Sequence, residues 1–222
     1  MRAVLLLPGR SALGRLLLVA GLTLASASRL AAQECLRPSG TKANWAALGS
    51  GLAEGSHKAV TLEIGRNFLP DLAVFAETDA LIWNGGGEPL PTRRSFRFTG
   101  AYRVHAATRE NDTMLDALAL CVTAAPEHVR VGDLKILHLP VGLVVSSEWQ
   151  SASGKWRIVP HVEPRFGYRR AVVEGFSQSS AAISLQLGAT AALDRYFGGL
   201  QFQRPLTTGD AWTARLRVGL EF

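Results

Sequence analysis

Residues 212–222 read WTARLRVGLEF, and this stretch decides the fold. Every second residue in it is apolar, namely Trp212, Ala214, Leu216, Val218, Leu220 and Phe222. The residues between them are polar or small, namely Thr213, Arg215, Arg217, Gly219 and Glu221. A period of two places these two sets on opposite faces of a β-strand. Strands with one apolar and one charged face, repeated around a closed sheet, are what a β-barrel needs to cross a bilayer.

The same alternation recurs along the chain and predicts an all-β protein. We expect about ten strands, near residues 43–53, 60–64, 72–82, 96–105, 118–123, 139–145, 156–169, 183–190, 195–203 and 212–222. The first strand has the weakest pattern, and eight strands are the alternative if the first pair does not span the membrane. The predicted fold is a closed, antiparallel, up-and-down transmembrane β-barrel over residues 43–222.

The first 33 residues have the composition of a cleaved signal peptide. Arg2, Arg10 and Arg15 supply positive charge, and residues 16–25 (LLLVAGLTLA) form an apolar run too short for a spanning helix. Cleavage after Ala27 or near residues 31–33 fits the small residues there, and we favour the second. Residues 34–42 then form a periplasmic segment before the barrel. An uncleaved membrane anchor is the alternative.

The net charge of +6 belongs largely to this targeting segment. Of the 24 basic residues, Arg2, Arg10, Arg15 and Arg29 lie in residues 1–33, whereas none of the 18 acidic residues does. The exported chain therefore keeps 20 basic and 18 acidic residues, a net charge of +2. Nucleic-acid binding needs a clustered basic face, so we expect no nucleic-acid partner.

An even number of strands places both ends of the barrel on the periplasmic side. Connections near 54–57, 84–93, 125–135, 170–178 and 205–210 are then expected outside the cell, and those near 68–71, 107–116, 150–155 and 191–194 in the periplasm. Aromatic residues near the strand ends predict two interfacial belts: Trp83, Phe96, Tyr168, Phe202 and Trp212 at the outer ends, and Trp149, Trp156, Tyr196 and Phe222 at the inner ends. Pro160 and Pro164 lie inside one strand and predict a bulge or irregular pairing there.

With its last six residues, RVGLEF, the chain resembles the bacterial outer-membrane β-barrels, of OmpA/OmpX type or porin-like. The resemblance covers residues 43–222 in architecture and carries no family-specific catalytic motif. It implies a location in the outer membrane, contact with its lipids, and recognition by the barrel-assembly machinery. Gly219, Leu220 and Phe222 are the residues of the assembly signal that it implies.

If the apolar face contacts lipid, the charged face lines the lumen. That face carries Glu63, Glu77, Asp79, Arg97, Arg103, His105, Arg157, His161, Glu163, Arg165, Arg195, Arg215, Arg217 and Glu221. A barrel of about eight to ten strands has an interior filled by side chains, and buried charges there must be paired. We therefore expect an internal ion-pair network and a structural role. A narrow polar channel for small solutes is the alternative.

Cys35 and Cys121 are the two cysteines of the chain, and both follow the export signal. An even number of cysteines in an oxidising compartment favours a disulfide. Cys121 has lumenal parity because Leu120 and Val122 face the other way. We expect the bond to draw residues 34–42 into or across the periplasmic mouth. Two unpaired cysteines are the alternative.

Two other functions compete with this interpretation. A soluble, lipocalin-like barrel has the same alternation with its apolar face inward, around a hydrophobic ligand. A lipid-hydrolysing barrel enzyme is suggested by His161 and Glu163, which share a face. A nucleophile motif such as Gly-x-Ser-x-Gly is missing, however, and the five histidines lack metal-ligand spacing. We expect neither catalysis nor a cofactor.

Overall fold

The last strand pairs with the first, and this pairing closes the sheet. In the computed structural model, β1 (Asn44–Ala53) runs antiparallel to β12 (Thr213–Glu221), with Trp45 opposite Glu221 and Ala53 opposite Thr213. Backbone bonds between Asn44 and Phe222 extend the seam to the end of the chain. The structure describes residues 35–36, 43–53, 57–69, 71–83, 93–106, 118–151, 153, 155–207 and 212–222.

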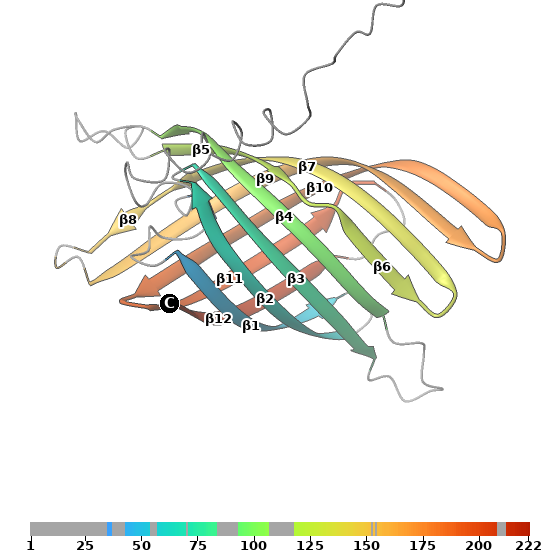
Figure 1. Cartoon of the computed structure of the whole chain (residues 1–222), viewed down its shortest axis with the longest axis horizontal. Helices are drawn as coiled ribbons and strands as arrows, with labels where there is room; N and C mark the ends of the chain where they lie inside the picture. Colours follow the sequence, from blue (N-terminus) through green and yellow to red (C-terminus); the bar gives the residue numbers. More distant parts are fainter. Residues whose placement is uncertain are drawn as a thin grey trace, which may run out of the picture.

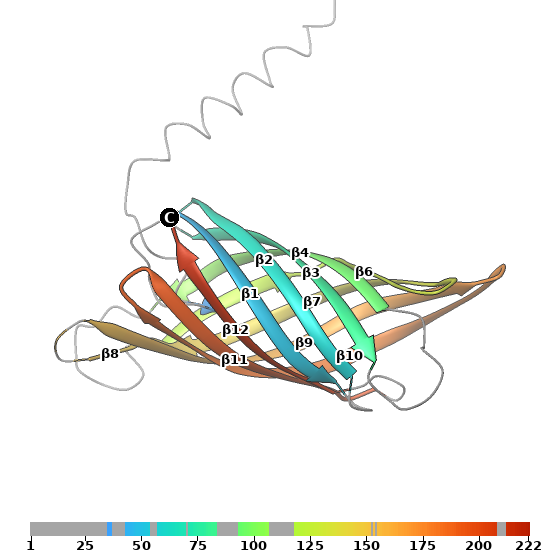
Figure 2. The same ribbon diagram turned by 90° about the horizontal axis from the view of Figure 1, so that it is seen from below.

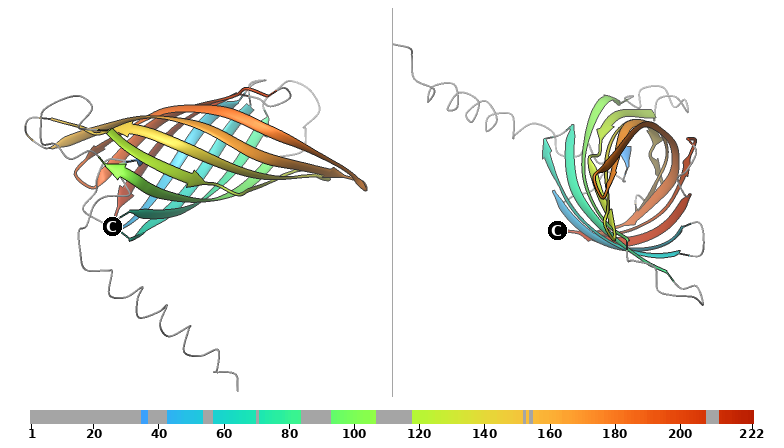
Figure 3. Two further views of the ribbon diagram at one scale, coloured as in Figure 1. Left: turned by 90° about the horizontal axis from the view of Figure 1, so that it is seen from above. Right: turned by 90° about the vertical axis from the view of Figure 1, so that its right-hand side faces the viewer.

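The remaining strands follow in chain order around the barrel (Figures 1 and 2). They are β2 (His57–Leu69), β3 (Leu72–Trp83), β4 (Arg93–Ala106), β5 (Leu118–Ala124), β6 (Glu127–Val131), β7 (Leu134–Ser147), β8 (Trp149–Gln150), β9 (Trp156–Val173), β10 (Phe176–Leu193) and β11 (Tyr196–Pro205). We call the end that holds Asn44 and Phe222 the terminal end, and the opposite end the distal end. Figure 3 shows the strands enclosing one lumen.

Ten strand positions, which we call walls, surround the lumen. This number matches the ten strands that the alternation predicts. β5 and β6 follow one another along the same two neighbours, β4 and β7, and together make one wall. The short β8 only extends the edge of β9. The predicted outer loop near 125–135 is wrong. Only Ala125 and Pro126 interrupt the wall there, because Pro126 has no N–H to donate to a ladder, and the chain then continues as β6 to a tight turn at Gly132.

The predicted loop near 170–178 is also shorter than expected. β9 and β10 stay paired from Trp156 opposite Leu193 up to Val173 opposite Phe176, and only Glu174 and Gly175 form the turn. Both turn residues have positive φ, 42° and 85°, a conformation that a two-residue hairpin connection requires. Because β11 pairs with β10 only from Ser184 onward, the tip of this hairpin projects at the distal end (Figure 1).

Of the bulge or irregular pairing expected at the prolines of β9, the structure shows irregular pairing without a bulge. Pro160 and Pro164 oppose Ala189 and Leu185 of β10 in unbroken register. On the other side, the ladder with β7 skips the two rungs around Pro164 and resumes in the same register. A proline removes one donor, so it interrupts a ladder without shifting it. Register shifts lie instead between Asn67 and Leu69 of β2 and between Arg103 and His105 of β4.

Most large apolar side chains face outward along the walls, and a set of buried charged side chains faces inward. Large hydrophobic residues are exposed, for example Leu200 at 64% and Phe166 at 61%, whereas Glu163 is completely buried. The lipocalin alternative is therefore wrong, because it requires the opposite arrangement. The described aromatic residues of both expected belts are exposed: Phe96, Tyr168, Phe202 and Trp212, and Trp149, Trp156, Tyr196 and Phe222. The side chain of Trp83 lies outside the described residues.

Among the described residues, no helix is long and apolar enough to cross a membrane. The expected signal peptide, residues 1–33, lies outside the described part of the chain. Of the expected periplasmic segment, residues 34–42, the structure describes Cys35 and Leu36.

Candidate functional site

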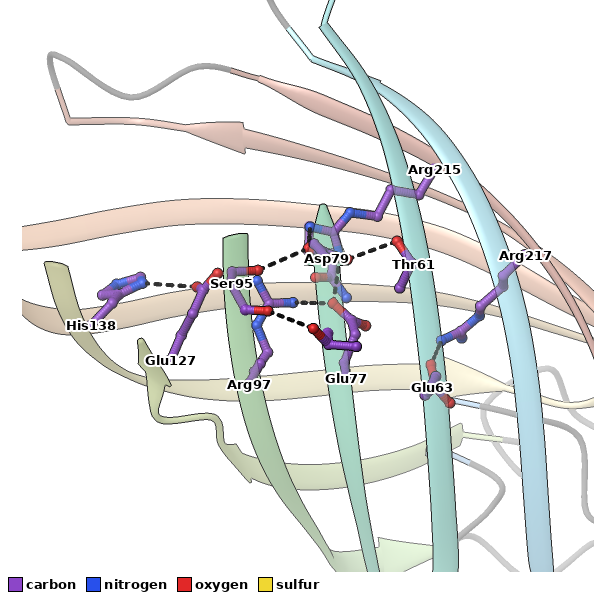
Figure 4. Close-up of polar contacts among 12 residues, drawn as sticks. Thr61, Glu63, Glu77, Asp79, Ser95, Arg97, Glu127, His138, Arg215 and Arg217 are labelled. Carbon is purple, nitrogen blue, oxygen red and sulfur yellow. Dashed lines mark hydrogen bonds and ion pairs between the residues drawn. The ribbon is translucent and has the colours of Figure 1, made fainter. Parts of the chain in front are cut away.

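An ion-pair cluster crosses the distal half of the lumen (Figure 4). Arg97 on β4 contacts Glu77 on β3 through Nη1 at 3.2 Å and Glu127 on β6 through Nη2 at 3.1 Å. Arg215 on β12 reaches over β1 and β2 to pair with Glu77 and, at 2.6 Å, with Asp79 on β3. Two arginines therefore share Glu77, and the cluster joins strands from both sides of the seam.

Hydroxyl groups add hydrogen bonds to Asp79 in this cluster. Thr61 on β2 donates to Asp79 Oδ1 at 2.7 Å, and Ser95 on β4 donates to Asp79 Oδ2 at 3.3 Å. His138 on β7 places Nδ1 at 3.7 Å from Glu127. Buried charges are tolerated when they are paired and hydrogen-bonded, and Asp79 meets both conditions.

A second cluster lies across the seam nearer the terminal end. Arg217 on β12 pairs with Glu63 on β2 at 2.9 Å. Trp45 on β1 donates its indole N–H to the other oxygen of Glu63 at 2.8 Å. Trp45 is 2% exposed, so this aromatic residue faces the lumen, unlike the aromatic residues of the belts.

A third cluster surrounds Glu163 on β9. Its carboxylate accepts hydrogen bonds from Arg165 at 2.7 Å, from Gln186 on β10 at 3.0 Å and from Thr123 on β5. A Cβ at Gly142 of β7 would overlap both Glu163 and Thr123. This glycine therefore makes room for the carboxylate against the opposing wall.

An apolar plug fills the terminal end of the lumen. The predicted disulfide between Cys35 and Cys121 is present, with the two Cα atoms 6.1 Å apart. Cys35 and Leu36 are buried, and the backbone oxygen of Leu36 accepts a hydrogen bond from Thr190 on β10 at 3.0 Å. Cys35 and Leu36 thus lie inside the lumen, held by β5 on one side and by β10 on another. Around it pack buried apolar residues, namely Ala101, Ala119 and Val144, with Phe75 alongside.

Other charged residues of the predicted network lie nearer the terminal rim. Arg103 pairs with Asp71 in the β2–β3 turn at 2.8 Å, Arg157 is half-buried, and Glu221 is buried. The prediction that Arg195 lines the lumen is wrong. It lies in the β10–β11 turn with its guanidinium over the ring of Tyr196, because the chain turns before the strand begins. The side chain of His105 lies outside the described residues.

Several lumenal residues were not predicted. Glu127 falls inside the loop expected near 125–135, and the weak pattern of residues 43–53 does not predict which way Trp45 faces. Thr61, Thr123 and Gln186, by contrast, lie on the polar parity of their strands, which is the parity expected to face the lumen. Trp45 shares its parity with the small residues Ala47, Gly49 and Gly51, a pattern that indicates a lumenal face with space for one large side chain.

A small cavity of about 150 Å³ opens above the first cluster at the distal end. Its charged lining is mostly basic: Arg93, Arg97, Arg169, Arg215, His138 and Glu127. A larger groove of about 850 Å³ lies on the outside of the barrel over β1, β10, β11 and β12. Its lining includes Leu52, Leu187, Leu200, Phe202 and Leu216, which are exposed apolar residues of the outer face.

His161 and Glu163 do not form an acid–base pair. Neither ring nitrogen of His161 has a hydrogen-bond partner among the described residues, and its ring packs against Gly188. Among the described residues, Glu163 accepts its hydrogen bonds from Thr123, Arg165 and Gln186. Within the described ranges, no group of three His, Cys, Asp or Glu residues could hold a metal ion. Among the described residues, the arrangement stabilises charges in pairs.

This geometry defines the class of the protein: a closed, ten-stranded transmembrane β-barrel of the outer-membrane type, with an apolar exterior and a charged interior.

Comparison with solved structures finds barrels of this type. The N-terminal β-barrel domain of Pseudomonas aeruginosa OprF matches at 12% identity and a TM-score of 0.38, over 82% of this chain and 99% of that one. The β domain of the Bordetella autotransporter BrkA matches at 11% and 0.42, over 81% and 99%. Acinetobacter baumannii Omp33 matches at 10% and 0.39, over 82% and 98%. No family model matches the chain, and no curated protein does.

Proposed function

We propose that the chain is an exported outer-membrane protein whose barrel is a structural scaffold with a closed lumen. One observation carries this proposal: ion pairs from β12 reach across the lumenal face to β2 and β3. Arg215 and Arg217 are the side chains that make these contacts. A solute passing through the lumen would have to break buried, paired charges, which costs several kcal/mol for each pair.

The plug at the terminal end supports the same proposal. Leu36 is held in the lumen by the neighbouring disulfide and by its own hydrogen bond to Thr190. Trp45, Phe197 and three alanines form a second apolar cluster at this end, and Phe75 packs against both clusters. The lumen is thus filled by charged groups towards its distal end and by apolar groups at its terminal end. We assign no catalytic role to it.

Planar-bilayer recording tests the closed lumen. The oxidised, exported chain should give no steady conductance. The double variant Glu77→Ser/Arg215→Ser removes the three ion pairs that these two residues make, without changing the net charge. Together with reduction of the Cys35–Cys121 bond, which frees the plug, it should open a measurable path. Arg204→Ser, on the exposed face of β11, is the matched control and should stay closed. Steady conductance in the unmodified protein would contradict the proposal.

A narrow, anion-preferring path is the second candidate. It is favoured by the distal cavity, where four arginines and one histidine outnumber the single acid in the lining. Guanidinium groups bind carboxylates and phosphates with directed pairs of hydrogen bonds. If conductance is found, its reversal potential in a salt gradient should indicate anions, and Arg93→Gln/Arg169→Gln should shift it towards cations.

The proposal also covers export of the chain and assembly of the barrel in the membrane. We propose that residues 1–33 are removed as a signal peptide and that residues 34–42 and 43–222 form the periplasmic segment and the barrel. We also propose that Gly219, Leu220 and Phe222 are read by the barrel-assembly machinery. Leu220 and Phe222 are exposed on the outer face, where another protein can reach them, whereas a Cβ at Gly219 would overlap Phe197 inside the lumen. Mass spectrometry of the exported chain tests the cleavage site.

A further inference from the structure

Four basic side chains stand together on the outside of the barrel at its distal end. They are Arg94 on β4, Arg130 on β6, Lys135 on β7 and Arg170 on β9, and we call them the basic patch. All four are exposed and share the outward parity of their strands. These strands are neighbours in the sheet, as Figure 1 shows for β4, β6 and β7.

The register brings like charges into direct opposition. Arg94 is the cross-strand partner of Arg130, and Arg130 is the partner of Lys135. Side chains that oppose each other on one face have Cβ atoms about 4.5–5.5 Å apart, and like charges there are destabilising. Arg170 joins the row because its partner, Leu137, is two residues from Lys135 on the same face. An anion bound between these side chains would relieve their repulsion.

Acidic residues of the protein do not neutralise the patch. On the described outer surface of the distal end, the acids are Asp133 and Glu174, which lie in the two adjacent turns. No ion pair joins either of them to the patch within the described part of the chain. Within the described ranges, the one polar contact of the four side chains runs from Arg130 Nε to the backbone oxygen of Gly132 at 3.2 Å.

An apolar surface begins directly below the patch. Below Arg130 the next outward residue is the exposed His128, which lies between two apolar neighbours. The next outward residue towards the terminal end is Phe96 below Arg94, Leu137 below Lys135, and Tyr168 below Arg170. These side chains are 54%, 41% and 45% exposed. The face therefore offers cations at the membrane boundary and apolar contact immediately inside it, an arrangement that suits an anionic amphiphile.

We propose that the basic patch binds a phosphorylated glycolipid of the outer leaflet, of the lipid A class. Its phosphates would lie among Arg94, Arg130, Lys135 and Arg170, and its acyl chains along Phe96, Leu137 and Tyr168. Arginine pairs with phosphate through two parallel hydrogen bonds, and lysine does so as a point charge. The inference rests on the proposed outer-membrane location, with the distal end outside the cell, and it adds a partner that a structural role alone does not require.

Native mass spectrometry of the oxidised, exported chain in neutral detergent tests the patch. The probe is bisphosphorylated lipid A, and the comparison lipid is the same molecule without its phosphates. The triple variant Arg94→Gln/Arg130→Gln/Lys135→Gln should bind lipid A at least about tenfold more weakly than the unmodified chain. The matched control, Arg66→Gln/Lys155→Gln/Arg195→Gln, removes three exposed charges near the terminal end and should bind it unchanged.

Three outcomes would overturn the proposal. The first is an equal loss of lipid A binding in the two triple variants. The second is equal binding of lipid A and the dephosphorylated lipid to the unmodified chain. The third is displacement of lipid A by inorganic phosphate at the same concentration. A heat-dependent shift in gel mobility shows that each variant is a folded barrel. Failure of lipid binding in a chain that shows this shift counts against the patch alone, whereas loss of the shift in the unmodified chain counts against the barrel.

Discussion

Arg217 and Glu63 form a salt bridge of 2.9 Å although 154 residues separate them in the chain. The bridge passes over β1 and ties the last strand to the second one, so it spans the seam that closes the barrel. Glu63 is nearly inaccessible to solvent, and its second oxygen is bound by Trp45. The seam is therefore held by backbone pairing and by lumenal charges together.

Arg217→Gln should destabilise the folded barrel by about 3–5 kcal/mol, because it leaves the carboxylate of Glu63 buried without its cation. The double variant Glu63→Gln/Arg217→Gln should lose less, because both charges disappear. Urea titration in lipid vesicles, followed by gel mobility without boiling, measures the free energy of unfolding. Arg204→Gln, on the exposed face of β11, should change it by less than about 0.5 kcal/mol. Equal losses in the single variant and this control would contradict the account of the seam.

Reduction of the Cys35–Cys121 bond should lower stability. The bond closes a loop across a sequence separation of 86 residues. Chain entropy gives an upper bound of about 4–5 kcal/mol for a loop of this length. The same urea titration with and without a thiol reductant measures the effect. The variant Cys35→Ser/Cys121→Ser is the control, since its midpoint should be low and unaffected by reductant; a reductant effect in that variant would point to another cause.

Gly65→Ala should destabilise the barrel, whereas Gly100→Ala should not. A Cβ at Gly65 would overlap the ring of Trp45, while a Cβ at Gly100 has no atom within 4 Å. Overpacking of this kind costs about 1–3 kcal/mol. The unfolding midpoint and the tryptophan emission of the two variants check the prediction. An unchanged midpoint and spectrum in Gly65→Ala would show that Trp45 does not lie against β2.

Leu200→Arg should impair folding into lipid, because Leu200 faces outward from the middle of β11 and is 64% exposed. A charge on the lipid face costs about 2–4 kcal/mol at the bilayer midplane and little outside it. Phe176→Arg places the same charge at the tip of the β9–β10 hairpin, where Phe176 is 80% exposed, and should fold normally. Folding yields in lipid vesicles compare the two, and equal yields would place Leu200 outside the membrane.

The sequence predicted the barrel because alternation is a local property that survives in every strand. The inward set of Glu63, Glu77, Arg97 and Arg215 follows directly from parity. The pairing among them could not be predicted, since Arg215 meets Glu77 only after the sheet closes and brings β12 near β3.

The wrong predictions lie at positions where the pattern of neighbouring residues does not reflect how the strands pair. Loops are predicted near residues 125–135 and 170–178, yet paired strands continue to tight turns in both places. Tryptophan is a residue type typical of membrane interfaces, yet Trp45 lies in the lumen. Its small neighbours and Gly65 leave space for its ring, and Glu63 accepts its indole N–H. Local sequence does not contain that cross-strand information.

Spin labelling at two adjacent residues tests the central claim most directly, that the apolar parity faces lipid and the charged parity is packed inside. Leu200→Cys and Gln201→Cys each add one reactive thiol, because the native pair is bonded. In lipid vesicles, a label at 200 should collide with oxygen, which concentrates in the hydrocarbon, and a label at 201 should be shielded from both oxygen and a water-soluble nickel reagent. Nickel access at 201 would reveal a water-filled lumen, and oxygen access at 201 with nickel access at 200 would reverse the two faces; either result would contradict the account.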